Sequence, residues 1–181
     1  MNIAYMAEQG QERDLQLDVV KKCKIGIVEI GVLFGDSTRY FLTNTDVPVY
    51  GIDPIIPDSM NDSLIGNLEI INKIKEEFPK FTFINEYSFN VVKDFNYKFD
   101  YLFIDADHLY EAVKRDFLDW YPLLSDTGYL GFHDSAAFRG GAYHWPGPSK
   151  FVDELLEDLD KYNLVHYRTL NSLTILQKII K

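Results

Sequence analysis

Cysteine, basic residues and long apolar runs are all scarce in this chain of 181 residues, and each scarcity excludes a class of protein. Cys23 is the single cysteine, so an intrachain disulfide framework and a cysteine-based zinc cluster are excluded, and a reducing compartment fits. No window of about 18 apolar residues exists, and the N-terminus has no signal-peptide core. We therefore expect a cytoplasmic protein that does not enter a membrane.

Basic residues are outnumbered by acidic ones, with 18 Lys and Arg against 28 Asp and Glu, which gives a formal net charge of −10. Such a surface repels a phosphate backbone, so nucleic acid is a poor candidate for the partner. The acidity could help to hold a divalent cation, or it is simply a solvated surface. The remaining composition, 46% hydrophobic and 25% charged, is that of an ordinary globular domain with one core.

Short β-branched or aromatic runs alternate with amphipathic stretches along the chain. The runs predicted to be strands are 25–30, 47–52, 81–84, 101–104 and 129–132, and the predicted helices are 36–42, 64–78, 110–124 and a stretch around 151–159. Each strand run is apolar enough to be buried on both faces, as in a parallel sheet. The segments 164–168 and 173–176 flank a short turn and predict an antiparallel hairpin.

This order of elements predicts an α/β fold: a Rossmann-like, doubly wound sheet of seven strands, mostly parallel, with a C-terminal antiparallel hairpin. We expect residues 1–181 to form one domain, with 1–23 as an N-terminal extension and 24–177 as the core. Ligands of such sheets bind beyond the carboxyl ends of the strands, where the strand order switches. Four acids, Glu29, Asp53, Asp105 and Asp134, come at or near predicted strand ends, which suggests that they are functional.

A turn with two glycines, Gly31 and Gly35, joins the first predicted strand to the first predicted helix. Glycines at this place let the backbone approach a nucleotide-like ligand at the helix N-terminus, although a tight turn alone would also use them. The dinucleotide fingerprint needs glycine where this chain has Leu33 and Asp36, which argues against a nicotinamide cofactor. Asp53, after the second strand, is placed to accept hydrogen bonds from two ribose hydroxyls, to shape the following turn, or to do both.

Four segments of the chain, 28–37, 51–53, 103–108 and 132–134, resemble successive motifs of class I S-adenosylmethionine-dependent methyltransferases. The strongest resemblance is to the family that includes macrolide-sugar O-methyltransferases and cephalosporin-hydroxylase-like proteins, with a second similarity to catechol and caffeoyl-CoA O-methyltransferases. The resemblance implies S-adenosylmethionine as cofactor. It also implies methyl transfer to a hydroxyl of a small molecule, such as a sugar or a catechol-like acceptor.

The same resemblance implies which residues hold the cofactor. Glu29 would bind its methionine amino group, Asp53 would hold its ribose, and Ser88 would lie beside its adenine. The other residues that the resemblance places in the cofactor site are Gly31, Gly35, Ser37 and Asp105. These roles are implied by matched positions.

Matched positions also suggest a metal site and a base. Asp105 and Asp134 match metal-binding carboxylates, and His108 matches a proposed general base. The chemistry agrees, because Mg²⁺ prefers oxygen ligands and lowers the pKa of a coordinated hydroxyl, so that a neutral His or an Asp can remove the proton. Ser135 stands where the related families often place Asp or Asn as another ligand. Asp107 could replace that ligand, or it could cap the helix that follows.

For His133 and for the loop 135–148, the sequence leaves more than one role possible. His133 could act on the substrate, yet a histidine beside a strand end is more often a hydrogen-bonded structural residue. The loop 135–148 is long enough to be a lid, and its side chains could line an acceptor pocket, pin the loop to the core or form a subunit contact. Those side chains are Phe138, Arg139, Tyr143, His144 and Trp145.

Two classes compete with a methyltransferase. One is a catalytically silent binding module that keeps only the fold, and the other is a nicotinamide or flavin oxidoreductase. The glycine spacing argues against the oxidoreductase, and the presence of Asp53, Asp105, His108 and Asp134 together argues against the silent module. The sequence leaves open which acceptor is used and whether the chain forms a homo-oligomer.

Overall fold

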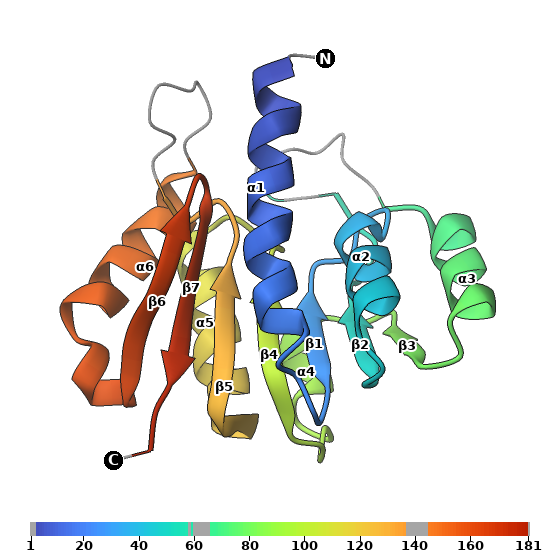
Figure 1. The fold of residues 1–181 in the computed structure, drawn as a ribbon. Coiled ribbons are helices and arrows are strands. Elements are labelled where there is room, and N and C mark those ends of the chain that lie inside the picture. The colour runs from blue at the N-terminus through green and yellow to red at the C-terminus, as the bar shows by residue number, and fades with distance from the viewer. Residues whose placement is uncertain (1–2, 58, 60–65, 137–144, 181) are drawn as a thin grey trace.

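The computed structural model describes residues 3–57, 59, 66–136 and 145–180, and seven strands in this part of the chain form one sheet (Figure 1). The strand order is β3-β2-β1-β4-β5-β7-β6; β1 to β5 are parallel, and β7 is antiparallel to both β5 and β6. The strands are β1 (Ile27–Ile30), β2 (Val49–Ile52), β3 (Phe81–Ile84), β4 (Phe99–Ile104), β5 (Leu124–Phe132), β6 (Leu164–Leu170) and β7 (Leu173–Lys178). The predicted doubly wound sheet with its C-terminal hairpin is confirmed.

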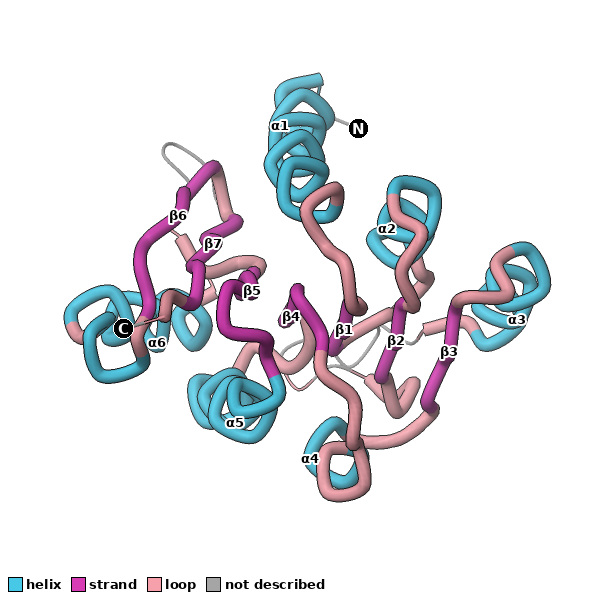
Figure 2. The backbone as a smooth tube through the Cα atoms, turned by 60° about the horizontal axis from the view of Figure 1, so that its bottom comes forward, coloured by secondary structure: helices cyan, strands magenta, loops and turns pink. Residues whose placement is uncertain are grey.

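Helices cover both faces of this sheet, as Figure 2 shows. One face carries α1 (Ile3–Val20), α2 (Asp36–Asn44) and α3 (Leu68–Glu77). The other face carries α4 (Ser88–Val91), α5 (Tyr110–Trp120) and α6 (Pro146–Glu157). Two 3₁₀ turns, Tyr121–Leu123 and Leu159–Tyr162, follow α5 and α6. Within the described residues, no helix is both long enough and apolar enough to cross a membrane.

The described part of α3 begins later than the predicted helix 64–78, whose first two residues lie outside the described residues. Asn67 caps α3, because its side-chain oxygen accepts the backbone N–H groups of Glu69 and Ile70. The apolar spacing then buries Ile71 and Ile74 against the sheet. Capping and periodicity together therefore account for the helix that is seen.

The predicted helix 110–124 ends early, at Trp120. Pro122 lacks a backbone N–H and fits a tight 3₁₀ turn better than a helix interior. The chain then extends at once, so that β5 begins at Leu124 and pairs this residue with Phe99 of β4. The four-residue helix α4 is too short to give a periodic signal, which explains why the sequence did not predict it.

Two apolar clusters, one on each face of the sheet, make up the core. Alternate residues of a strand point to opposite faces, so in β4 Phe103 joins one cluster and Leu102 joins the other. The segment predicted to be an N-terminal extension forms α1, and its residues Leu15, Val19 and Val20 are buried in the cluster with Phe103. The N-terminal helix is thus packed on the sheet.

The strand order reverses between β1 and β4, which are neighbours in the middle of the sheet. The connections from β1 and β4 leave on opposite faces, to α2 and α5 (Figure 2). Ligands of open α/β sheets bind outside the strand ends at such a reversal. The candidate site lies at this point.

Candidate active site

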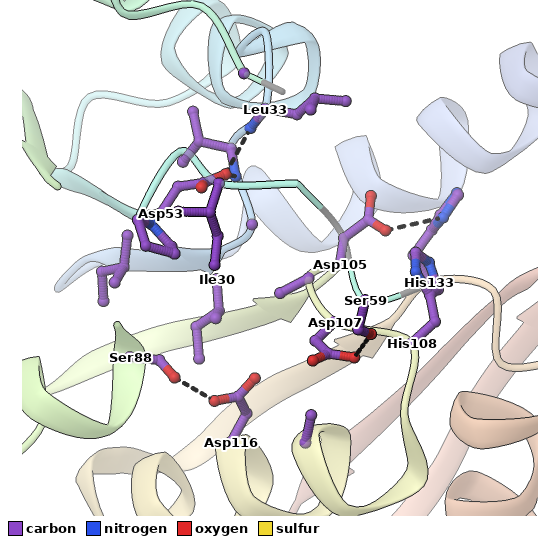
Figure 3. A pocket seen from close by; sticks show the side chains of 18 of the residues that line it. Ile30, Leu33, Asp53, Ser59, Ser88, Asp105, Asp107, His108, Asp116 and His133 are labelled. Carbon is purple, nitrogen blue, oxygen red and sulfur yellow. Dashed lines mark hydrogen bonds and ion pairs between the residues drawn. The ribbon is translucent and has the colours of Figure 1, made fainter. Parts of the chain in front are cut away.

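A cavity of about 680 Å³ opens beyond the carboxyl ends of β1, β2, β4 and β5. Figure 3 shows its side chains from close by. Its volume falls in the range of small-molecule and cofactor pockets. The predicted site residues that line it are Gly31, Ser37, Asp53, Ser88, Asp105, His108 and Asp134. Two other predicted residues, Glu29 and Gly35, are not among the lining residues.

The glycine turn after β1 needs its glycines. Gly31 and Gly35 both have positive φ angles, 92° and 78°. A Cβ atom on Gly31 would lie 2.0 Å from the carbonyl oxygen of Asp105, which no side chain could tolerate. The turn therefore packs directly against the end of β4, and this contact brings the first motif and Asp105 to the same wall of the cavity.

Asp53 shapes this turn as well as lining the cavity. Its Oδ2 accepts the backbone N–H groups of Val32 and Leu33, both at 2.8 Å, and its Oδ1 accepts the N–H of Ile55 at 2.7 Å. The turn role considered for Asp53 is thus observed directly. Oδ1 accepts one hydrogen bond and keeps a further lone pair, so one acceptor site is left for the ribose role that the resemblance implies.

Glu29 lies beneath the cavity, with 0% of its surface exposed. Its two carboxylate oxygens accept hydrogen bonds from the hydroxyls of Ser37 and Thr38, the second and third residues of α2. Burial raises the pKa of Glu29 to about 8, although these hydrogen bonds oppose the shift. Contact between Glu29 and a ligand would pass through Ser37, which does line the cavity.

Asp105, His108 and Asp134 gather where β4 and β5 end. Each offers one ligand atom, and the three atoms lie within 4.8 Å of one another. The His108 Nε2 atom is 3.1 Å from Asp134 Oδ2, and the His108 ring stacks on Trp145, with ring centroids 4.3 Å apart. The two predicted metal ligands and the predicted base therefore lie together at one edge of the cavity.

His133 lies between the same carboxylates. Its Nδ1 is 3.3 Å from Asp105 Oδ1 and 3.4 Å from Asp134 Oδ2, and its Nε2 is 3.4 Å from Glu12 Oε2. Burial works against charging the ring, but the three surrounding acids hold the pKa of His133 well above its usual value. Burial likewise opposes ionisation of Asp134, yet His108 and His133 hold its pKa well below the usual range.

Glu12 is a residue that sequence reasoning missed. It belongs to α1 and is 7% exposed, and its Oε1 accepts the backbone N–H and the hydroxyl of Ser172, both at 2.8 Å. Ser172 lies in the turn between β6 and β7. Glu12 therefore links the N-terminal helix to the C-terminal hairpin and to His133. No motif surrounds this acid, so no signal in the sequence pointed to it.

Ser135, which stands where related families often place another ligand, and Asp107, the replacement considered for it, both make bonds within the chain. The Ser135 hydroxyl is buried and donates to the carbonyl oxygen of Phe132 at 2.8 Å. Asp107 Oδ1 accepts the backbone N–H of Leu109 at 2.8 Å and also the hydroxyl of Ser59. Asp107 thus forms a turn just before α5, whose N-cap residue is Leu109 and has no side-chain cap bond, so the helix-cap role considered for Asp107 is not seen. The candidate cation cluster in the described residues consists of Asp105, His108 and Asp134.

Ser88 lies on another side of the cavity, where α4 and α5 meet. Its hydroxyl donates to the carboxylate of Asp116, a buried acid of α5 that also lines the cavity. Sequence reasoning missed Asp116 too, although the helical spacing places it on the buried face with Val113, Phe117 and Trp120. Of the loop residues considered for an acceptor pocket, Trp145 is described, whereas Phe138, Arg139, Tyr143 and His144 lie outside the described residues.

Comparison with known proteins connects this cavity to a family. A family whose description is "Methyltransferase domain" matches residues 28–135, which run from β1 through the strand ends to Ser135. The chain belongs to this methyltransferase family. The matched stretch contains every lining residue discussed above except Trp145. Family and fold are those of class I S-adenosylmethionine-dependent methyltransferases.

The individual proteins that this chain resembles share little sequence identity with it. The chain is 27% identical over 139 residues to an uncharacterized protein, R132, of Acanthamoeba polyphaga mimivirus; the match covers 75% of this chain and 62% of that protein. Among solved structures, the calicheamicin methyltransferase CalS11 is similar with a TM-score of 0.71 and 14% identity, covering 97% of this chain and 80% of that one. The O-methyltransferase NovP is similar with a TM-score of 0.65 and 19% identity, covering 93% and 80%. A methyltransferase of Streptococcus mutans in complex with SAH has a TM-score of 0.64 and 12% identity, covering 92% and 97%.

Proposed function

We propose that this chain transfers the methyl group of S-adenosylmethionine to a hydroxyl of a small molecule, such as a sugar or a catechol-like acceptor, with His108 as general base. The observation that carries the proposal is that Asp105, His108 and Asp134 converge in the same cavity as the glycine turn. The net charge of −10 favours a small acceptor over nucleic acid.

In the proposed reaction, the acceptor oxygen attacks the methyl carbon as the carbon–sulfur bond breaks. The hydroxyl proton passes to the imidazole of His108, and S-adenosylhomocysteine leaves. The carboxylate of Asp134, 3.1 Å from His108 Nε2, orients the ring and stabilises the imidazolium that forms. Trp145 stacks on the same ring and limits its rotation.

The proposal includes a divalent cation such as Mg²⁺, for which the donor set is suitable. His133 contacts Asp105 Oδ1 and Asp134 Oδ2, which leaves the second oxygen of each carboxylate for an ion. A cation held there would lower the pKa of an acceptor hydroxyl and offset the developing negative charge. His108 cannot serve as both ligand and base, so the proposal assigns the ion to the two carboxylates.

The test combines cofactor binding with an acceptor screen. Calorimetry on the purified chain should show binding of S-adenosylmethionine and S-adenosylhomocysteine. Transfer of a radiolabelled methyl group should then be measured for a panel of sugars and catechols, with Mg²⁺ and after chelation. Tight binding of a nicotinamide cofactor without binding of either sulfur compound would refute the methyltransferase function. Full activity after exhaustive chelation would refute only the cation.

A further inference from the structure

The first turn of α6 lies against the segment that carries His108. Helices α5 and α6 are neighbours on one face of the sheet (Figure 2). A Cβ atom on Gly147, the second residue of α6, would lie 2.1 Å from the carbonyl oxygen of His108 and 2.6 Å from the backbone nitrogen of Tyr110. The two backbones are therefore in direct contact at this glycine.

Close approach, and not backbone conformation, explains the glycine. Gly147 does not have a positive φ angle, so alanine could adopt the same backbone, and alanine has the higher helix propensity. The residues on either side are Pro146 and Pro148, whose fixed φ angles make this turn stiff. A stiff turn in contact with the His108 backbone limits how far that backbone can move.

Trp145 contacts the His108 ring from the same turn. It is the N-cap residue of α6, a position that favours short polar side chains, and its side chain makes no capping bond. Its indole instead stacks on the His108 imidazole, with ring centroids 4.3 Å apart and an angle of 23° between the planes. Tilting the imidazole would lose this contact, so the indole restricts rotation of the ring.

A third contact joins this turn to the partner of His108. The Ser149 hydroxyl is buried and lies 3.5 Å from the backbone carbonyl oxygen of Asp134. The carboxylate of the same Asp134 is 3.1 Å from His108 Nε2. The first turn of α6 thus contacts both members of the His108–Asp134 pair.

We propose that this turn is a positioning element, in which Trp145 sets the plane of the His108 ring and Gly147 sets its backbone, so that Nε2 points at Asp134. The inference rests on the proposed function, since it takes His108 as the base. Misplacing a reacting group by about 1 Å can lower turnover about 10²-fold, so a base needs such support. Trp145 and Gly147 are positioning residues, because neither exchanges a proton.

The first experiment observes the ring itself and needs no acceptor. With ¹⁵N-labelled histidine, a proton on His108 Nε2 that is hydrogen-bonded to Asp134 should give a resolved NMR signal, which its loss in His108→Ala identifies. Trp145→Ala and Gly147→Ala should lose this signal, because the freed ring exposes the proton to exchange with water. Trp145→Phe should keep it, since a phenyl ring can also stack.

The second experiment measures methyl transfer to the compound of the sugar and catechol panel that is turned over. Trp145→Ala should lower kcat about 10-fold to 100-fold, with the affinity for S-adenosylhomocysteine unchanged. In a His108→Ala background the same substitution should cost less than about threefold, because no base remains to be positioned. A Trp145 that only lined an acceptor pocket would instead raise KM in both backgrounds.

Glu154→Ala is the matched control. It removes the 2.5 Å bond that Tyr110 donates to α6, at a residue that does not line the cavity. It should lower the melting temperature and leave the NMR signal and kcat at wild-type values.

Two results would overturn the inference alone. One is the absence of an Nε2–H signal in the wild type, or an unchanged signal in folded Trp145→Ala, which decides the matter if Gly147→Ala does not fold. The other is an equal loss of turnover from Trp145→Ala with and without His108. Turnover of His108→Ala within about threefold of wild type would overturn the base assigned in the proposed function, and the role of the turn with it.

Discussion

Asp134 and Asp116 are both carboxylates on the wall of one cavity, yet their neighbours differ. Asp134 faces two imidazole rings, and they hold its pKa well below the usual range against the effect of burial. Asp116 faces one hydroxyl, and burial raises its pKa to about 7. The side of the cavity near β5 thus favours a negative charge on Asp134. The side at α5 holds a buried carboxylate that accepts a hydrogen bond from the Ser88 hydroxyl.

Replacing His108 by Ala should have the largest effect and tests the β5 side of the comparison. Removal of a positioned base should lower turnover about 10²-fold to 10⁴-fold, while the affinity for S-adenosylhomocysteine stays nearly unchanged. Turnover must be expressed per folded molecule, with the melting temperature as control. A loss of less than about threefold would show that His108 packs against Trp145 without acting as the base.

Asp116→Asn should change how stability depends on pH, since Asp116 is the carboxylate of the pair whose pKa is raised. The pKa of Asp116 in the folded protein, about 7, exceeds the ordinary 3.8. Asp116 therefore does not destabilise the fold below about pH 4, and its destabilising effect grows as the pH rises to about 7. The variant should therefore gain free energy of unfolding relative to wild type between pH 4 and 8, by at most about 4 kcal/mol. Urea titrations at both pH values measure the difference. A relative loss on raising the pH would contradict the environment described for Asp116.

Glu12→Gln should have an intermediate effect and tests how the β5 side is held together. The variant weakens two charge-assisted hydrogen bonds to Ser172 and one contact with His133, so we expect a loss of about 1.5–3 kcal/mol in the free energy of unfolding. Ser172→Ala is the matched control, because it removes one of those bonds without touching His133. If both variants behave alike in stability and in turnover, Glu12 acts only as a link to the hairpin.

Asp107→Asn should have the smallest effect, and it tests whether Asp107 belongs to the candidate cation cluster of Asp105, His108 and Asp134. The amide oxygen can still accept the N–H of Leu109, so stability should change by less than about 0.5 kcal/mol. Binding of Mn²⁺, followed by electron paramagnetic resonance, should match the wild type if the protein binds that ion. Weaker Mn²⁺ binding in this variant would place Asp107 among the ligands.

Much of the fold could be predicted because the strands are short, apolar and separated by periodic helices. The ends of β1, β2, β4 and β5 were visible in the sequence, and a parallel sheet brings such ends to one edge. This reasoning led to Asp53, Asp105 and Asp134, all of which line the cavity. The limits of α5 and β5 were less accurate, since a single proline decides where the helix stops.

The remaining site residues depend on contacts that strand ends do not reveal. Glu12 reaches His133 only because α1 packs over the sheet, and this packing is a long-range outcome. Ser135 follows Asp134 directly, yet its hydroxyl bonds to backbone carbonyl groups and is buried. Asp116 could have been suspected, because an acid on the apolar face of a helix is unusual and calls for a partner.

The bonds between Glu12 and Ser172 join residues 160 positions apart in the chain. Contacts of such separation require the closure of a long loop, and they contribute to slow folding. A chain emerging from the ribosome can form β1 to β5 and their helices before Ser172 has been synthesised. Glu12 contacts His133 with one carboxylate oxygen and bonds Ser172 of the hairpin with the other, so the closed hairpin fixes the position of Glu12 beside His133. The side of the cavity near β5, with Asp105, His133 and Asp134, is therefore expected to reach its final arrangement among the last steps of folding.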